Sequence, residues 1–340
     1  MDEHPAFQQR LLVMPEDGIE AVVDLIDQAR AELRLKLFKL ESDALQQALL
    51  RAHGRGVVVR VMLNPRTSGG VRWNDQAFAR LQSSGLEVSW TSDSFPVTHE
   101  TSMVVDNQLA LIATFDFSDQ SFSETSDYAV LSASAPVVDQ VRAGFDADWN
   151  HTFFEPDLGV GLVWSSFHSR RQMARLLDSA ERSLWIQHPK FVDAVILDRI
   201  ISARERGVKV RVLCGGKHGI SDRDIPDTFA SLRLMERSGV KVRRQKHLQL
   251  HAKLILVDGA CALVGSMSID RTAFDLRREL GIETDVPQVV ARLKDAFQHD
   301  WDLARKYRAP DPLDLSQHEK GERPADPHFV HEWLLCQATG

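Results

Sequence analysis

An internal repeat constrains the fold of this chain more than any other feature of its sequence. Residues 99–149 align with residues 251–301 at a constant offset of 152 (251 − 99 and 301 − 149). Upstream, residues 31–63 align with residues 183–213 when short gaps are allowed, and RGVVVRVML matches RGVKVRVLC. The chain is therefore expected to contain two copies of one structural unit.

Each copy reads as a strand, a turn, a helix with apolar residues at three- and four-residue intervals, and a second strand rich in β-branched residues. This order predicts a βαβ unit. We expect an α/β fold of two similar repeats, each a mixed, mostly parallel sheet flanked by helices, packed with pseudo-twofold symmetry. Loops at the strand ends of both copies are then expected to meet in one cleft.

Proline and glycine mark the expected boundaries of these units. The stretch FFEPDLGVG separates a first repeat at 11–150 from a second at 160–305. Residues 306–340 are rich in proline and charge, which predicts an extended C-terminal tail.

Composition limits the function only weakly. The N-terminus is acidic where a signal peptide would be basic, and no apolar run reaches the roughly 18 residues that a membrane helix needs. We therefore expect a cytoplasmic protein and leave peripheral contact with a membrane open. The three cysteines are widely spaced, without a zinc-binding pattern. The net charge of −7 argues against nonspecific binding to polyanions but does not exclude a local basic cleft.

The segment HAKLILVDG alternates as a strand does, which places His251 and Lys253 on one face. A histidine beside an ammonium group suits attack on a phosphate diester. The imidazole can act as nucleophile or proton donor, and the lysine can neutralise charge on the nonbridging oxygens. This set of residues requires no metal ion or other cofactor.

Two further features support this site. The segment GSMS supplies a glycine that allows close approach to a ligand, and the hydroxyls of Ser266 and Ser268. Glu279 follows His251 by 28 residues (279 − 251), and Asp127 follows His99 by the same interval (127 − 99). Each copy thus offers its own histidine a carboxylate that can fix the tautomer of the ring.

The motif HAKLILVD resembles the His-x-Lys-x(4)-Asp motif of the phospholipase D superfamily, and GSMSIDRTAFDLRREL is similar to the corresponding stretch of its cardiolipin-synthase-like members. In that family two motifs meet between the copies, one histidine forms a phosphohistidine, and the other protonates the leaving group. The resemblance implies a histidine pair of His99 and His251, with His99 favoured as the nucleophile. It also implies Lys253 as a phosphate ligand and Ser266 as a donor, with Asp258 supporting the structure beneath them.

The first copy, HETSMVVD, keeps His99 and Asp106 but has Thr101 in place of the motif lysine. Asp116 replaces the asparagine usual in the family, and Ser126 replaces an arginine. These changes should leave a bound phosphate poorly neutralised, which predicts reduced activity.

Lys39 and Lys190 occupy equivalent places after the first strand of each copy and are our candidates for compensating charge. The expected substrate-binding set is Ser266, Ser268, Thr114, Asp116, Thr101, Lys39 and Lys190.

The expected function is a phosphodiesterase or phosphatidyltransferase, with phospholipid favoured over nucleic acid as substrate. A nuclease of the same superfamily is one alternative, and an inactive protein that binds a phosphate ligand or a partner through the same cleft is another. Because both motifs lie in one chain, the site does not require a dimer, and the oligomeric state is left open.

Overall fold

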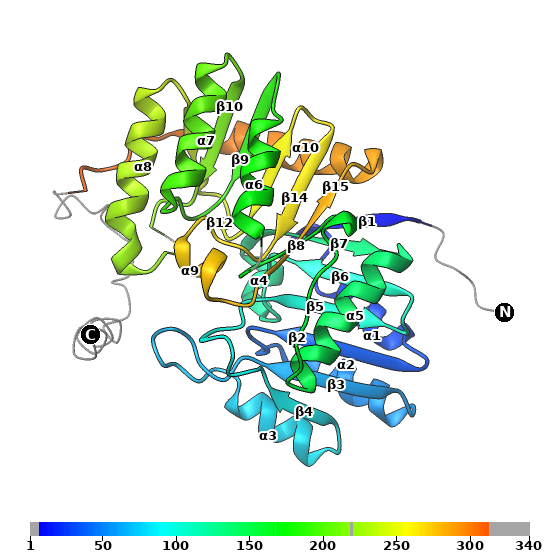
Figure 1. Cartoon of the computed structure of the whole chain (residues 1–340). Helices are drawn as coiled ribbons and strands as arrows, with labels where there is room; N and C mark the ends of the chain where they lie inside the picture. The colour runs from blue at the N-terminus through cyan, green and yellow to red at the C-terminus, as the bar shows by residue number, and fades with distance from the viewer. Residues whose placement is uncertain (1–6, 167, 218–219, 313–340) are drawn as a thin grey trace.

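The computed structural model describes residues 7–166, 168–217 and 220–312. Two α/β halves pack against each other, the first coloured blue to green and the second green to orange (Figure 1). The first half consists of β1 (Gln9–Met14), α1 (Glu20–Gln28), β2 (Glu32–Leu37), α2 (Asp43–Gly54), β3 (Val58–Leu63), α3 (Asp75–Ser83), β4 (Glu87–Trp90), β5 (Thr101–Val105), β6 (Leu109–Ala113), α4 (Asp119–Ser123), β7 (Thr125–Ser132) and α5 (Ala135–Trp149).

The second half repeats this order with small additions. It consists of a 3₁₀ turn η1 (Leu158–Val160), β8 (Leu162–Trp164), α6 (Ser169–Asp178), β9 (Ser183–Gln187), α7 (Ala194–Glu205), β10 (Lys209–Cys214), η2 (Asp222–Asp224), α8 (Ile225–Arg237), β11 (Lys241–Arg244), β12 (Gln249–Leu250), β13 (Leu254–Val257), β14 (Cys261–Gly265), α9 (Arg271–Asp275), β15 (Leu280–Thr284), α10 (Pro287–Leu303) and β16 (Arg305–Lys306). Most of the predicted tail, residues 313–340, lies outside the described residues.

Each half contains an eight-stranded mixed sheet. The first has the order β1-β7-β6-β5-β2-β3-β4, with β12 paired to β7, and the second has the order β16-β11-β10-β9-β13-β14-β15-β8. Only β2, β3 and β4, their counterparts β9, β10 and β11, and the β12–β7 pair are parallel. The expectation of mostly parallel sheets is therefore wrong, because helical crossovers join only the early strands and short turns join several later ones.

Apolar faces explain why the helices form where they do. Helix α2 buries Leu45, Ala48, Leu49 and Ala52, which recur at three- and four-residue intervals along one side. Helices α1, α2 and α3 cover one face of the first sheet, whereas α5 belongs to a cluster on the other face. Helices α6, α7 and α8 cover the outer face of the second sheet.

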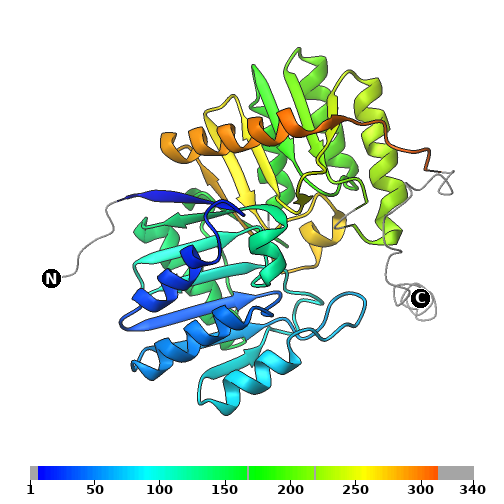
Figure 2. The same ribbon diagram turned by 180° about the vertical axis from the view of Figure 1, so that it is seen from behind.

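One hydrophobic cluster joins the two halves. It contains Ile112 and Val130 from the first sheet, Leu254 and Val264 from the second, and the buried sides of α5 and α10. Figure 2, the view from behind, shows α10 crossing the second sheet. The interface between the halves is therefore an apolar core, which fixes their relative position more firmly than a polar contact would.

The motif aspartates bind the backbone at the starts of β9 and β2. Asp258 adopts φ = 54°, and its carboxylate accepts backbone N–H bonds from Glu181, Arg182 and Ser183 at 3.0, 2.7 and 2.7 Å. Partial burial raises the pKa of Asp258, but these three donors outweigh it and hold the pKa below its usual range. The carboxylate of Asp106 likewise accepts backbone N–H bonds from residues 30, 31 and 32 at the start of β2.

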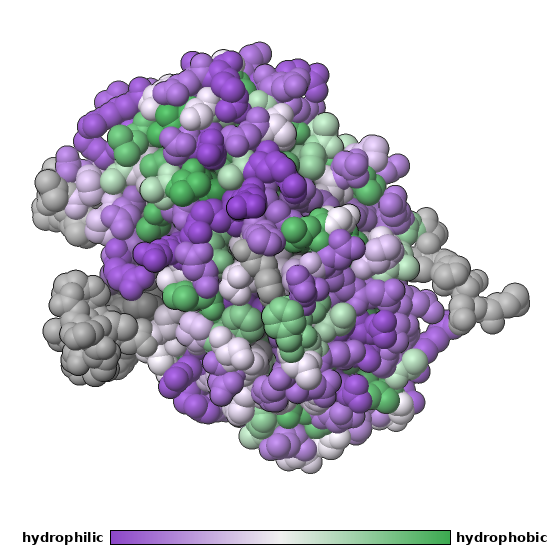
Figure 3. Space-filling view, viewed as in Figure 1, coloured by the Kyte–Doolittle hydropathy of each residue, from purple (hydrophilic) through white to green (hydrophobic). Residues whose placement is uncertain are grey.

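Polar side chains predominate on the face shown in Figure 3, where apolar residues form scattered patches. Within the described ranges, no helix has both the length and the apolar character needed to cross a membrane.

Candidate active site

The two motif histidines lie at equivalent places where the halves meet. The backbone N–H of His99 donates to the carbonyl of Arg278 at 2.9 Å, and that of His251 donates to the carbonyl of Ser126 at 3.3 Å. Each histidine is thus anchored to the half that did not supply it. The predicted meeting of the two copies is present.

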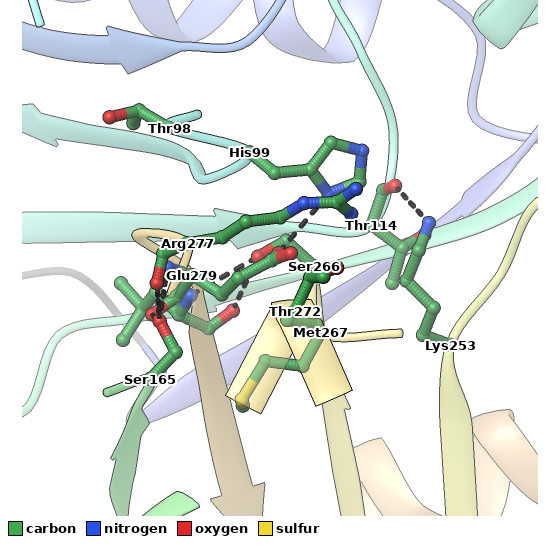
Figure 4. A network of polar contacts seen from close by, with 12 residues as sticks. Thr98, His99, Thr114, Ser165, Lys253, Ser266, Met267, Thr272, Arg277 and Glu279 are labelled. Atoms are coloured by element: carbon green, nitrogen blue, oxygen red, sulfur yellow. Dashed lines mark hydrogen bonds and ion pairs between the residues drawn. The ribbon is translucent and has the colours of Figure 1, made fainter. Parts of the chain in front are cut away.

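Each imidazole is paired with a buried carboxylate through Nδ1. The distance from His99 Nδ1 to Glu279 Oε2 is 3.1 Å, and that from His251 Nδ1 to Asp127 Oδ1 is 3.0 Å (Figure 4 shows the first pair). The expectation that each histidine uses the carboxylate of its own copy is wrong, because the motif segments cross to strands of the opposite half. With Nδ1 bound, Nε2 is the ring nitrogen left to act on a ligand.

The carboxylate beside His251 is the more strongly held of the two. Asp127 is fully buried and accepts hydrogen bonds from Thr114 Oγ1 at 2.5 Å and Thr125 Oγ1 at 2.6 Å. Burial raises the pKa of Asp127, but the neighbouring His251 and Lys253 bring it below its usual range. Asp127 therefore stays ionised and can accept a hydrogen bond from the Nδ1–H of His251.

Lys253 lies directly beside His251. Its Nζ is 2.8 Å from the carbonyl oxygen of His251 and 3.4 Å from His251 Nε2. It is also 3.3 Å from the carbonyl oxygen of Thr114, the contact drawn in Figure 4. Strand β13 begins only at Leu254, yet the two side chains lie together as the alternation predicted. Burial lowers the pKa of Lys253, although Asp127 and Asp116 partly oppose this effect.

The first half has no cation at the position of Lys253. Thr101 begins β5, is 3% exposed and pairs across the sheet with Ala113. Asp116 is half-buried and adds negative charge near Lys253. The histidine pair is therefore served by one motif lysine, as the sequence indicates.

The two lysines expected to compensate are both engaged elsewhere. Lys190 Nζ is 2.6 Å from Asp224 and 2.7 Å from Asp270, and the side chain is buried. Lys39 pairs with Glu41 at 2.6 Å and lies over the ring of Trp73. Two carboxylates neutralise Lys190, so it cannot supply the missing charge without breaking these ion pairs.

Two hydroxyl groups of the expected binding set, those of Ser266 and Thr114, accept backbone N–H bonds. Ser266 Oγ accepts the N–H of Leu280 at 3.1 Å, and its repeat equivalent Thr114 accepts the N–H of Tyr128 at 2.9 Å. Ser268 is buried. These contacts attach the Gly-Ser segment to the strand that carries the carboxylate.

Ser126 does not mark a lost phosphate ligand. Its hydroxyl donates to the buried carboxylate of Asp300 at 2.8 Å, and its repeat equivalent Arg278 binds the buried carboxylate of Asp148 at 3.0 Å. The arginine of the family pattern therefore makes an internal ion pair in this chain. At the equivalent place in the first half, Ser126 replaces this ion pair with a hydrogen bond from a neutral hydroxyl to an ionised carboxylate.

Two residues near the site were missed by the sequence analysis. Arg277 extends in the direction of His99 (Figure 4), and its guanidinium lies 3.4 Å from Ser68 Oγ of the first half. His188 is buried and lines a small pocket together with Lys253. Burial lowers the pKa of His188 to about 3, so its ring is neutral. The segment RREL (277–280) could have pointed to Arg277, because Arg277 precedes Glu279 by only two residues.

The described part of the chain contains no group of three or more His, Cys, Asp or Glu side chains that could hold a metal ion.

Comparisons with known proteins identify the same repeat. A family model described as "Cardiolipin synthase, PLD-like domain" matches residues 22–149 and again residues 173–301. "Cardiolipin synthase A" of Pseudomonas putida is 26% identical over 349 residues, covering 90% of this chain and 71% of that protein. "Cardiolipin synthase" of Staphylococcus aureus is 25% identical over 331 residues, covering 84% of this chain and 66% of that protein.

A solved structure has the same architecture. The crystal structure of phosphatidylserine synthase from Haemophilus influenzae superposes with a TM-score of 0.71 at 15% identity, covering 90% of this chain and 89% of that one. At this identity the likeness concerns the fold alone. The family model, which matches both halves, carries the assignment: the chain belongs to the phospholipase D superfamily, with two PLD-like domains of the cardiolipin synthase type.

Proposed function

We propose that the chain cleaves or transfers phosphodiesters through a phosphohistidine intermediate. The observation that carries this proposal is the pair of histidines, each held at Nδ1 by a buried carboxylate from the opposite half. This arrangement leaves both Nε2 atoms for chemistry, one to attack and one to transfer protons.

In the proposed first step, Nε2 of His99 attacks phosphorus while the bond from phosphorus to the leaving oxygen breaks. His251 gives its Nε2 proton to that oxygen. In the second step, His251 takes a proton from water or an alcohol, whose oxygen attacks phosphorus as the phosphorus–nitrogen bond breaks. The assignment of the acid to His251 is supported by Asp127, which stays ionised beside it.

The proposed substrate is a phospholipid, because the family and both curated relatives are named for cardiolipin synthesis. Incubation with phosphatidylglycerol micelles, followed by mass spectrometry, tests this. Transfer would release glycerol and form cardiolipin, whereas hydrolysis would form phosphatidic acid. Cleavage of DNA without change to the lipid would favour a nuclease, and no turnover of either would favour a binding protein.

Thr101→Lys is expected to raise turnover by roughly 10²-fold, because it restores one cation to the phosphate site. By the pseudo-symmetry with Lys253, the introduced ammonium is expected to reach the carbonyls of His99 and Ser266. Thr101→Met adds similar length without charge and should give no increase. An unchanged rate in a correctly folded Thr101→Lys protein, measured with the same lipid, would contradict a charge deficit at this site.

Arg277→Gln is expected to lower kcat/KM by about 10–100-fold, the range for losing a hydrogen bond to a charged group. Its side chain is 19% exposed, and its nearest carboxylate, Asp270, is 4.0 Å away and already paired with Lys190. Arg271→Gln is the matched control, because its side chain is 89% exposed on the adjoining helix α9. Equal rates for the two variants would remove Arg277 from the proposed site.

A further inference from the structure

A second basic site lies at the outer edge of the second sheet, away from the histidine pair. A cavity of about 870 Å³ opens between α8, β11, β16 and the end of α10. Seven arginine and lysine residues line it, against one acidic residue, Glu236. In a chain of net charge −7, this cavity, which we call the edge groove, is a local reversal of charge.

The strand register concentrates this charge. Arg211 lies directly opposite Lys241 in the β10–β11 pair, and Arg243 lies opposite Lys306 in the β11–β16 pair. Like charges facing each other across strands are destabilising. Among the described residues, Lys241 and Lys306 have no carboxylate partner, so a bound anion would relieve a repulsion that the fold leaves in place.

Two arginines of the groove are held in position before any ligand arrives. The guanidinium groups of Arg243 and Arg211 lie 4.6 and 5.2 Å from the ring centre of Trp301, and Arg243 also donates to the Trp301 carbonyl at 2.7 Å. Fixed guanidinium groups suit phosphate oxygens. Trp301 itself is 5% exposed, so its ring is not open for stacking on nucleic-acid bases.

Two exposed leucines lie on the helices that contribute residues to the groove. Leu234 of α8 is 46% exposed and adjoins the lining residue Arg233, and Leu303 of α10 is 53% exposed and lies between Trp301 and Lys306 in sequence. Cationic groups together with exposed leucines are typical of surfaces that bind at the boundary between lipid headgroups and acyl chains. This combination favours a lipid surface over a nucleic acid.

We propose that the edge groove binds the phosphate groups of anionic phospholipids and docks the chain on a bilayer surface. None of the residues of the histidine site lines this groove. The docking therefore goes beyond the proposed catalytic function and can be tested separately from it.

The test is cosedimentation of the full chain with phosphatidylcholine vesicles that contain or lack phosphatidylglycerol. Binding is expected only with phosphatidylglycerol and should weaken as salt is added. Lys241→Ala/Lys306→Ala is expected to lower the partition coefficient by roughly 30-fold, because each cation near an anionic surface contributes about fivefold. Arg10→Ala/Arg30→Ala removes the same charge from exposed positions of the first half and should change binding little.

Two further measurements make the result decisive. Leu234→Ala/Leu303→Ala is expected to weaken vesicle binding while leaving any binding of soluble tripolyphosphate unchanged. His99→Ala should bind vesicles as the unaltered chain does, whatever its activity. Equal binding to both vesicle types, equal binding by the lysine and control variants, or groove-dependent binding of duplex DNA without binding to vesicles would overturn the proposal.

Discussion

Alanine at His251 is expected to lower steady-state phosphodiester turnover by about 10²–10⁴-fold, the usual contribution of general acid–base catalysis. Alanine at His99 should lower it further, because no covalent intermediate can then form. His299→Ala, an exposed histidine on α10, is the control and should retain full activity.

The leaving group separates the roles of the two histidines. A nitrophenyl phosphodiester releases a stable anion that needs no proton, so His251→Ala should still release one nitrophenolate per chain and then stall as phosphohistidine. His99→Ala should give no such burst. The intermediate is measured by rapid acid-free quenching and mass spectrometry. A burst from His99→Ala that is absent from His251→Ala would reverse the assignment, and a full steady-state rate from both variants would exclude the phosphohistidine mechanism.

Much of this site could be predicted from the sequence because the repeat and the motif spacing are both local signals. The interval from His251 to Lys253 requires only neighbouring positions in the chain, and the two side chains do lie together. The equal intervals to Asp127 and Glu279 identified the two carboxylates correctly. The intervals could not reveal that each histidine pairs with the carboxylate of the other half, because spacing along the chain does not say which half lies beside a given strand.

Residues whose role depends on distant partners were the ones misjudged. Lys190 was expected to be available, but Asp224 and Asp270 approach it from other elements. Ser126 was counted as a lost phosphate ligand, but Asp300, 174 residues away, accepts its hydroxyl. Such contacts depend on tertiary packing, which a comparison of two repeats does not encode.

Arg278 of the second half joins Lys36, Glu100 and Asp148 of the first half in a buried charged network beside the apolar interface. Lys36 Nζ lies 2.5 Å from Asp148 and 3.2 Å from Glu100. The guanidinium of Arg278 donates two hydrogen bonds to Asp148, at 3.0 and 3.2 Å. At the repeat-equivalent place, Gln187 donates to Asp300 at 2.6 Å. Of these two equivalent carboxylates, Asp148 is thus bound by two cations, whereas Asp300 is bound by the Gln187 amide, the Ser126 hydroxyl and His247.

The pKa of Asp148 links this network to pH. Burial raises it, but Lys36 and Arg278 bring it below the usual range of aspartate. A carboxylate whose pKa is lower in the folded than in the unfolded chain stabilises the fold at any pH above its unfolded pKa. This stabilisation is lost as the pH falls through its folded pKa. The ion pairs should therefore stabilise the chain at neutral pH and lose their contribution only in acid below the usual titration range of aspartate.

Lys36→Met is expected to lower the free energy of unfolding by about 3–5 kcal/mol, because it leaves Glu100 buried without its cation. Gln187→Met, which removes neutral donor and acceptor groups at the equivalent place, should cost about 1–3 kcal/mol. Lys36→Met/Glu100→Gln should recover much of the loss by removing the unpaired charge. Urea denaturation followed by tryptophan fluorescence measures all three. Equal losses for Lys36→Met and Gln187→Met, with no recovery in the double variant, would mean that packing rather than charge pairing sets the contribution of this network to stability.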